Sequence, residues 1–172
     1  MTFAGIDVSK PHLDLALVSN SPKPTRLRFP NTPEGRQALL AALPEAEVLM
    51  GLPGVGPQVA AAVLALLPPE LWGRAKAAAS YAGLIPEREE SGKSVERGRL
   101  SRKGPPLLRR KLYMGALVAV RHDPEMRAFY HRLLSRGKTK KQALLAVAHK
   151  LLRRMMGRLR EYYAGQPAQG VA

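Results

Sequence analysis

Cysteine is absent from this 172-residue chain. Its absence excludes disulfide bonds and thiolate metal sites, and it fits a reducing compartment. Aromatic residues make up only 5% of the sequence, whereas alanine and leucine are abundant, which favours helices. The chain also lacks a charged-then-apolar leader and any apolar run near the roughly 18 residues that a membrane span needs. We therefore expect a soluble cytoplasmic protein with no membrane partner.

Acidic residues are also few, and their shortage falls in the second part of the chain. The sequence holds 28 Lys and Arg but only 13 Asp and Glu, for a net charge of +15. Residues 1–50 are neutral overall, so residues 51–172 carry the entire excess. Because such an excess of like charge works against a compact state, it indicates a polyanionic partner, most simply DNA. We expect a nucleoid-associated protein.

The first 47 residues follow a strand pattern. Short apolar or alternating stretches predict strands over residues 2–6, 12–18 and 25–29. Thr32, Pro33 and Glu34 then supply the cap, the first-turn proline and the first-turn acid of a helix that ends near Pro44. Three strands and one helix are too few for an α/β sheet with both faces covered. Residues 1–47 are therefore expected to form a partial domain.

From residue 48 onward the sequence is expected to be helical. Helices are predicted over residues 57–67, 70–83, 105–121, 123–137 and 139–163. Residues 166–172 are expected to be a frayed tail. The predicted fold class is thus α+β and mostly α, with a small β-strand fragment followed by an all-helical domain over residues 48–165.

The last predicted helix has two different faces. Its apolar stripe includes Met155 and Met156, which we expect to fill the core. Its other face carries the basic residues Lys140, Lys141, Lys150, Arg153, Arg154 and Arg158.

The stretch LPGVGPQVA places two glycines between helical segments. Gly54, Val55 and Gly56 precede Pro57, which suits the first turn of a helix. Glycines permit positive φ and close backbone approach, and amides at the new helix N-terminus can hold a phosphate oxygen. In a strongly basic segment, this two-glycine pattern predicts a helix-hairpin-helix element that binds the DNA backbone. The alternative is a plain turn between two helices.

Residues 85–104 form a long stretch without helical or strand periodicity, which is common in functional or disordered loops. The stretch contains serines at Ser91, Ser94 and Ser101. A serine hydroxyl needs a base or a strong positive field to attack a phosphate. The nearby cations that could supply this field and bind DNA are Lys93, Arg97, Arg99, Arg102, Lys103, Arg109, Arg110 and Lys111.

Asp7 is the candidate metal ligand. It stands near the end of the first predicted strand, where RNase H-like folds place a carboxylate that binds Mg²⁺ or Mn²⁺. Asp14 on the next strand is the only nearby acid, so the alternative is an Asp that caps a turn. The histidines have no metal-ligand spacing and are expected to be structural: His12, His122, His131 and His149.

Several stretches of the sequence, taken in order, resemble one protein family. They are GIDVSK, LDLAL, LPGVGPQVAA, YAGLIP, SGKSVERGRLSRKG, LLRRKLYMGALVAVRHDP and FYHRLLSRGK. The chain resembles the transposases of the insertion sequence 110 family, which are similar to the Piv-type DNA invertases. The resemblance covers nearly the entire chain.

This resemblance implies two domains and a chemistry. The first would be a RuvC-like domain of RNase H fold, in which an Asp-Glu-Asp-Asp set binds Mg²⁺, and Asp7 matches its first Asp. The second would be helical and would carry a serine nucleophile that forms a covalent link to DNA. Ser91 matches that serine best, and Ser94 is the second choice. The resemblance also implies a structured guide RNA as a partner.

The chain departs from the family pattern at residues 33–56. Here the sequence passes from the first helix of one domain to the start of the other, without three of the four metal carboxylates. One interpretation is an internally truncated transposase with impaired catalysis and no tightly bound Mg²⁺. The other is a non-enzymatic basic helical module that binds nucleic acid. A homo-oligomer or an intact relative is the expected protein partner.

Overall fold

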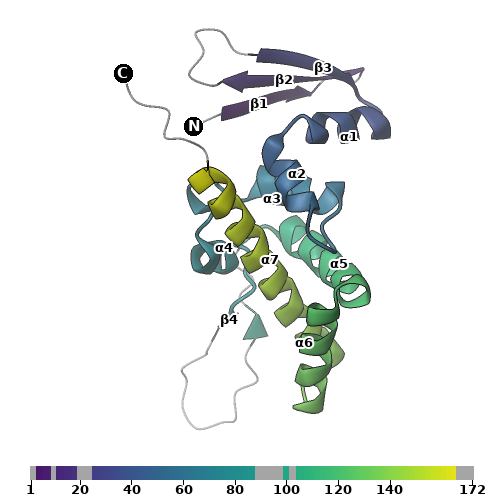
Figure 1. Cartoon of the computed structure of the whole chain (residues 1–172), viewed down its shortest axis with the longest axis vertical. Helices are drawn as coiled ribbons and strands as arrows, with labels where there is room; N and C mark the ends of the chain where they lie inside the picture. The colour runs from purple at the N-terminus through teal and green to yellow at the C-terminus, as the bar shows by residue number, and fades with distance from the viewer. Residues whose placement is uncertain (1–2, 9–10, 19–24, 88–98, 101–103, 166–172) are drawn as a thin grey trace. The chain divides into compact units, whose positions relative to one another are not determined.

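The computed structural model describes residues 3–8, 11–18, 25–87, 99–100 and 104–165. Contacts within the chain divide it into two compact units, Met1–Glu47 and Val48–Ala172. Helices predominate among the described residues (Figure 1), so the expectation of a mostly α protein is confirmed. None of the described helices is long and apolar enough to cross a membrane.

The first unit contains a three-stranded antiparallel sheet in the order β1-β2-β3. Its strands lie close to the predicted positions: β1 (Phe3–Val8), β2 (His12–Val18) and β3 (Thr25–Pro30). The pairing register sets Ile6, Leu15 and Leu27 side by side. The register therefore brings apolar residues of all three strands to the same level of the sheet.

Helix α1 (Pro33–Ala41) follows the sheet and packs against β2 and β3. It begins as predicted, because Thr32 Oγ1 accepts a hydrogen bond from the Gly35 amide at 3.1 Å and Pro33 lies in the first turn. Gly35 lies so close to Pro30 that a Cβ atom would collide with the Pro30 carbonyl oxygen. This close approach turns the chain from β3 into α1.

A short helix, α2 (Pro44–Met50), crosses the boundary between the two units. The sequence pattern predicts the end of a helix near Pro44 and helical structure again from residue 48, but a second helix already begins at Pro44. Proline suits the first turn of a helix, and the dipole favours the acids Glu45 and Glu47 there. Pro44 is therefore a start signal for α2.

The second unit is a helical assembly around its last and longest helix. Its helices are α3 (Pro57–Leu66), η1 (Pro69–Leu71, a 3₁₀ turn), α4 (Ala75–Tyr81), α5 (Pro106–His122), α6 (Pro124–Ser135) and α7 (Lys140–Gly165). Helix α7 packs against α4, α5 and α6, and α5 also packs against α3 (Figure 1). Met155 and Met156 are fully buried, as expected for core residues.

Two sequence expectations for this unit are corrected. Residues 70–83 do not form one helix, because Gly73 has a φ of +77° and separates η1 from α4. The turn is anchored by Trp72, whose Nε1 donates to the Leu67 carbonyl at 3.0 Å and whose ring stacks on Tyr163. Within the stretch expected to be aperiodic, β4 (Pro86–Glu87) and β5 (Arg99–Leu100) pair as antiparallel strands.

Candidate nucleic-acid interface

The two-glycine stretch forms a tight turn between α2 and α3. The Leu52 amide donates to the Leu49 carbonyl at 3.1 Å, and the Val55 amide donates to the Leu52 carbonyl at 3.0 Å. Val55 is only 4% exposed. Its side chain therefore belongs to the core and its amide to the turn, so Val55 supports the hairpin and offers no surface for a phosphate.

Gly54 is required for packing. Its φ is +90°, a conformation that side chains rarely adopt. A Cβ atom here would lie 2.5 Å from the Gly115 carbonyl oxygen and 2.8 Å from the Ala119 Cβ, both on α5. The close backbone approach expected at this glycine thus occurs, and it is made by the protein's own helix α5.

Gly56 is exposed and stands at the start of α3. Its φ is −87°, which any residue can adopt, and no atom lies within 4 Å of the position of a Cβ. Its carbonyl accepts from the amides of Val59 and Ala60. Within the described residues, the amides of Gly56 and Gln58 have no backbone acceptor, and α3 has no side-chain cap. These two donors therefore belong to exposed residues at the positive end of the helix dipole.

A lysine from α5 lies beside this helix end. Lys111 Nζ donates to Gln58 Oε1 at 2.5 Å, so a neutral partner holds the ammonium group near the first turn of α3. Arg110, the preceding residue, is exposed. Amides without an acceptor, a helix N-terminus and a lysine that has no acid partner within the described residues all favour an anion at the same place, and a phosphate oxygen fits this chemistry.

Arg109 has a structural task that the sequence pattern does not reveal. Its Nη1 donates to the carbonyls of Ala82 at 3.5 Å and Gly104 at 3.3 Å. Gly104 has a φ of +120° and lies so close to Tyr81 that a Cβ would collide with the Tyr81 carbonyl. Arg109 therefore ties the C-terminal end of α4 to the start of α5.

The two ends of the serine-containing stretch are thus held at fixed points. At the first end, the amides of Gly83 and Leu84 donate to the carbonyls of Ser80 and Ala79, which closes α4. Beyond it, β4 pairs with β5 through Glu87 opposite Arg99.

Most of the predicted residues of this stretch lie outside the described residues. They are Ser91, Lys93, Ser94, Arg97, Ser101, Arg102 and Lys103. The backbone of Arg99 is described as part of β5.

The predicted metal ligand, Asp7, lies in β1 directly opposite Asp14 in β2. Arg28 Nε donates to Asp14 Oδ1 at 2.7 Å, and this hydrogen bond lowers the pKa of the Asp14 carboxyl. Asp14 is therefore engaged by an arginine. Among the residues that the structure describes, no group of three or more His, Cys, Asp or Glu could hold a metal ion.

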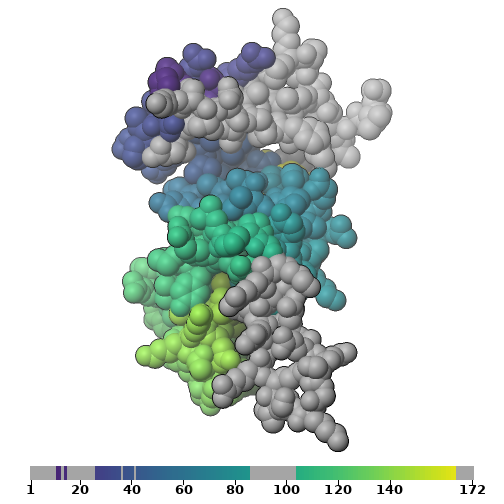
Figure 2. Space-filling view, turned by 180° about the vertical axis from the view of Figure 1, so that it is seen from behind, coloured from purple at the N-terminus to yellow at the C-terminus, as the bar shows by residue number. Residues whose placement is uncertain are grey.

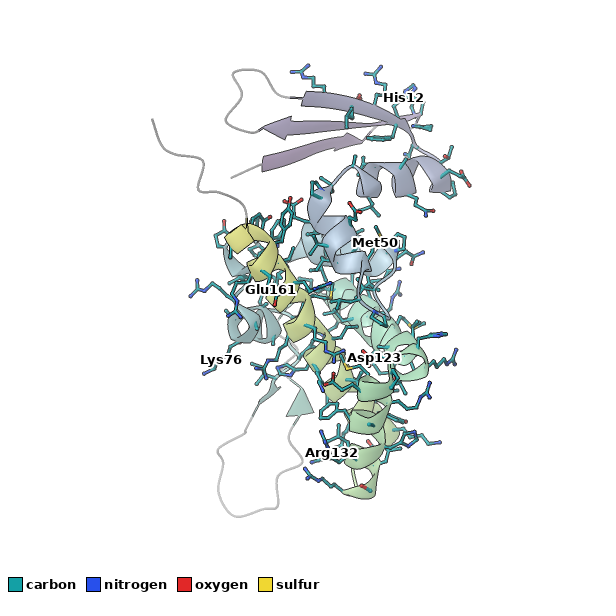
Figure 3. All side chains as sticks on the ribbon, viewed as in Figure 1. His12, Met50, Lys76, Asp123, Arg132 and Glu161 are labelled. Atoms are coloured by element: carbon teal, nitrogen blue, oxygen red, sulfur yellow. The ribbon has the colours of Figure 1, made fainter. Side chains whose placement is uncertain are left out.

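A charged cluster between α6 and α7 was missed by sequence reasoning. Asp123 is 8% exposed and caps α6 by accepting from the amides of Glu125 at 2.9 Å and Met126 at 3.1 Å. Arg154 Nη1 donates to Asp123 Oδ2 at 2.5 Å and also pairs with Glu125, and Lys150 Nζ lies 2.5 Å from Glu125 Oε1. Figure 3 shows Asp123 at the start of α6 beside α7.

This cluster neutralises part of the basic face of α7. Lys150 and Arg154 stand among its predicted cations, but both are paired with acids of α6. Burial works against the charged form of Asp123, yet the Met126 amide and Arg154 outweigh it and lower the pKa of this carboxyl. No periodic signal connects residues so far apart in the sequence, and only the fold brings them together.

His149 is half-buried in α7, and burial, together with the charge of Arg153, lowers its pKa. A neutral, half-buried imidazole on a packed helix agrees with the structural role expected for it.

Comparison with known proteins identifies relatives over most of the chain. A family model described as Transposase IS116/IS110/IS902 family matches residues 46–131. A 43.6 kDa protein of insertion element IS110 from Streptomyces coelicolor is 36% identical over 137 residues, which cover 78% of this chain and 34% of that protein. A 42 kDa protein of insertion element IS900 from Mycobacterium paratuberculosis is 33% identical over 129 residues, or 74% of this chain and 32% of the relative.

A third relative is a pilin gene-inverting protein of Moraxella lacunata, 34% identical over 110 residues that cover 62% of this chain and 34% of that protein. The chain thus spans about a third of the length of the curated relatives it matches. The family match includes the α2–α3 hairpin, α4 and α5. The chain therefore belongs to the IS116/IS110/IS902 family of transposases.

Proposed function

We propose that this chain serves DNA transposition or site-specific recombination, and that its helical unit holds DNA through the α2–α3 hairpin as a helix-hairpin-helix element. The observation that carries the proposal is the uncapped start of α3. There the amides of Gly56 and Gln58, which have no acceptor within the described residues, lie beside Lys111. A phosphate oxygen placed there would accept from the amides and be attracted by the ammonium group.

We also propose that the first unit is part of a RuvC-like domain of RNase H fold. Its support is the order of elements: three consecutive antiparallel strands, then a helix packed on β2 and β3, with Asp7 in β1. In a complete site, bound Mg²⁺ would polarise a DNA phosphate, and Asp7 would supply one of its ligands.

The chemistry would belong to the serine-containing stretch, with Ser91 as first choice and Ser94 as second. The serine oxygen would attack a DNA phosphorus and form a phosphoserine bond while one P–O bond of the DNA breaks. The serine proton would pass to a base or to the departing DNA oxygen. The anchoring of both ends of the stretch, through Arg109, Gly104 and the β4–β5 pair, supports such a role because a nucleophile must be positioned. A structured guide RNA would be a second polyanionic partner.

A non-enzymatic nucleic-acid-binding module is the second candidate. It is favoured by one observation: within the described part of the chain, Asp14 is bound by Arg28 and no carboxylate cluster could hold a metal. A covalent adduct assay separates the two candidates. The chain alone is expected to form no adduct with element-end DNA in Mg²⁺, whereas an adduct lost on Ser91→Ala would establish catalysis by this chain and identify the nucleophile.

The hairpin proposal is tested by the salt dependence of DNA binding. On duplex DNA, the log–log slope of affinity against salt changes by about 0.9 for each phosphate contact. Lys111→Gln should weaken binding to all sequences alike and reduce the slope by about one contact. Lys138→Gln, at an exposed lysine between α6 and α7, makes the same change in charge and is the matched control.

Equal losses in Lys111→Gln and Lys138→Gln would show that net charge alone attracts DNA, and the hairpin would then be only a turn. An affinity that does not change between low and moderate salt would reject phosphate binding altogether.

A further inference from the structure

Helix α5 carries an apolar stripe on its solvent side. Leu107 is 47% exposed, Met114 52% and Val118 43%. Their spacing of seven and four residues places them on one face of the helix. Only two other large apolar side chains in the described part of the chain are exposed to a similar degree, Leu27 and Tyr81, and neither is on this helix.

The stripe is separate from the packed face of α5. The opposite side of the helix is fully buried at Leu108, Leu112, Ala116 and Ala119, where it meets α3, α6 and α7. The core therefore does not need Leu107, Met114 or Val118. Figure 2 shows the side of the second unit on which α5, in green, reaches the surface next to α3.

The charged residues that α5 itself places beside the stripe have one sign. Arg110 and Arg121 are exposed and lie along one edge of it, at positions three and fourteen residues after Leu107. Helix α5 contains no acidic residue. The surface is thus an apolar ridge with a cationic border, and we name these five residues (Leu107, Arg110, Met114, Val118 and Arg121) the α5 stripe.

We propose that the α5 stripe docks an amphipathic helix of a partner protein whose apolar ridge is bordered by Asp or Glu. Leucines spaced by three, four and seven residues would fill the gaps between Leu107, Met114 and Val118. Carboxylates at the border would meet Arg110 and Arg121. The inference does not rest on the proposed nucleic-acid function, and Arg110, which precedes Lys111, borders both surfaces.

Charge argues against a second copy of the same helix as the occupant. Two α5 stripes laid against each other would bring arginines together without any acid from α5 to offset them. Duplex DNA would neutralise Arg110 and Arg121, but it offers the three apolar side chains little beyond thymine methyl groups. An acidic amphipathic helix satisfies both the charges and the apolar ridge.

The size of the α5 stripe determines the affinity that we expect for a partner helix. The twelve residues from Leu107 to Val118 span about 16 Å along the helix axis, which corresponds to about three turns of a partner helix. Such a contact belongs to the small, transient class of interfaces. We therefore expect a dissociation constant on the order of tens of micromolar for an isolated partner helix.

The test uses the full chain and two synthetic helical peptides of about 21 residues. Both carry leucine at the heptad a and d positions; one has Glu at the e and g positions and the other has Lys. Binding is measured by fluorescence anisotropy for the natural chain and for the double variant Met114→Gln/Val118→Thr. This variant keeps side-chain size and charge, and it leaves Arg110 unchanged. Tyr81→Gln, at an exposed apolar residue on α4, is the matched control.

The proposal expects the Glu peptide to bind at least tenfold more tightly than the Lys peptide. The double variant should lose at least tenfold in affinity for the Glu peptide, with an unchanged circular dichroism spectrum, while Tyr81→Gln retains it. Equal binding of the two peptides, or equal binding by the natural chain and the double variant, would overturn the proposal. A double variant that loses DNA affinity instead would assign the stripe to nucleic acid, and one that loses self-association in sedimentation would assign it to a second copy.

Discussion

Two helices of the second unit begin in opposite ways. Helix α6 begins at the buried Asp123, whose carboxylate accepts from two amides of the first turn and pairs with Arg154. Helix α3 begins at the exposed Gly56, which has no side chain to cap the amides behind it. Every helix leaves its first amides without internal partners. Asp123 satisfies two of them at α6, whereas the amides of Gly56 and Gln58 at α3 have no acceptor in the part of the chain that the structure describes.

The cations near these two helix starts differ in the same way. At α6, Lys150 and Arg154 are paired with carboxylates, so little charge is left for an external anion. At α3, the partner of Lys111 is the neutral amide of Gln58, which orients the ammonium group and leaves its charge available. A strongly basic composition therefore does not make every basic face a nucleic-acid surface. The difference directs attention to the start of α3.

The largest effect is expected from a substitution at Gly54, because this residue packs the hairpin before α3 against α5. Gly54→Val places a side chain at a φ of +90° and against the backbone of Gly115. Strain and overpacking of this kind together cost about 3 kcal/mol or more. We expect a strongly lowered midpoint in urea, or failure to fold, measured by circular dichroism.

Gly56→Val is the matched control for this change, since its Cβ would meet no atom within 4 Å. A Gly54→Val protein as stable as the natural chain would contradict the packing of the hairpin against α5.

A smaller effect is expected from removing the carboxylate that caps α6. Asp123→Ala removes the cap of α6 and one of the two carboxylates that pair with the half-buried Arg154. Loss of a cap costs about 0.5–2 kcal/mol, and we expect a loss near 2 kcal/mol in the free energy of unfolding. DNA affinity at a temperature where the variant is folded should stay within about twofold, because the side-chain hydrogen bonds of Asp123 go to α6 and α7 and not to the start of α3. Asp123→Asn keeps a capping oxygen and should lose less. An Asp123→Ala protein with unchanged stability would mean that the cluster does not hold α6 to α7.

Acid should reversibly weaken the cap and the ion pairs at the start of α6. The pKa of Asp123 and that of Glu125 are both lowered in the folded protein. A lowered folded pKa gives stability that is complete above the unfolded value, near 4, and is lost as the pH falls through the folded value. The melting temperature should therefore decrease once the pH is lowered below about 4. Asp123→Asn should show a shallower fall over the same range. Parallel curves for the two proteins would exclude Asp123 as a contributor.

Sequence reasoning could predict the elements much better than the pairings. The caps at Thr32 and Asp123 are local signals, and β2, α3, α5, α6 and α7 follow from periodicity and from proline at helix starts. The break at Gly73 was not predictable in the same way, because it depends on the contact of Trp72 with Tyr163 at the other end of the unit.

The candidate site shows the same limit. The positive φ of Gly54 could be predicted from the glycine pattern, but its packing against α5 could not. Lys111 was one basic residue among many in the sequence, and only its contact with Gln58 distinguishes it. Likewise, Arg109 could not be separated from its neighbours, since its hydrogen bonds reach carbonyls at Ala82 and Gly104. Local pattern determines element type, whereas long-range packing determines which charges remain available.

The smallest effect on stability should come from giving α3 a carboxylate cap like that of α6. The variant Gly56→Asp does this and tests the comparison most directly. In Gly56→Asp, the carboxylate can accept from the α3 amides, as Asp123 does in α6, and it meets the positive end of the helix dipole. Because a glycine cap is replaced by a preferred one, stability should rise by a few tenths of a kcal/mol, up to about 0.5. The same carboxylate would take the donors proposed for phosphate and repel it, so DNA affinity should fall about tenfold. Gly157→Asp, at a site on α7 with no atom within 4 Å of a Cβ, makes the same change in charge and should cost affinity far less. A protein that is more stable and yet binds DNA more weakly cannot be explained by damage to the fold. If Gly56→Asp instead binds DNA as tightly as Gly157→Asp does, the open amides of α3 are not a phosphate site, and the difference between the two helix starts has no functional meaning.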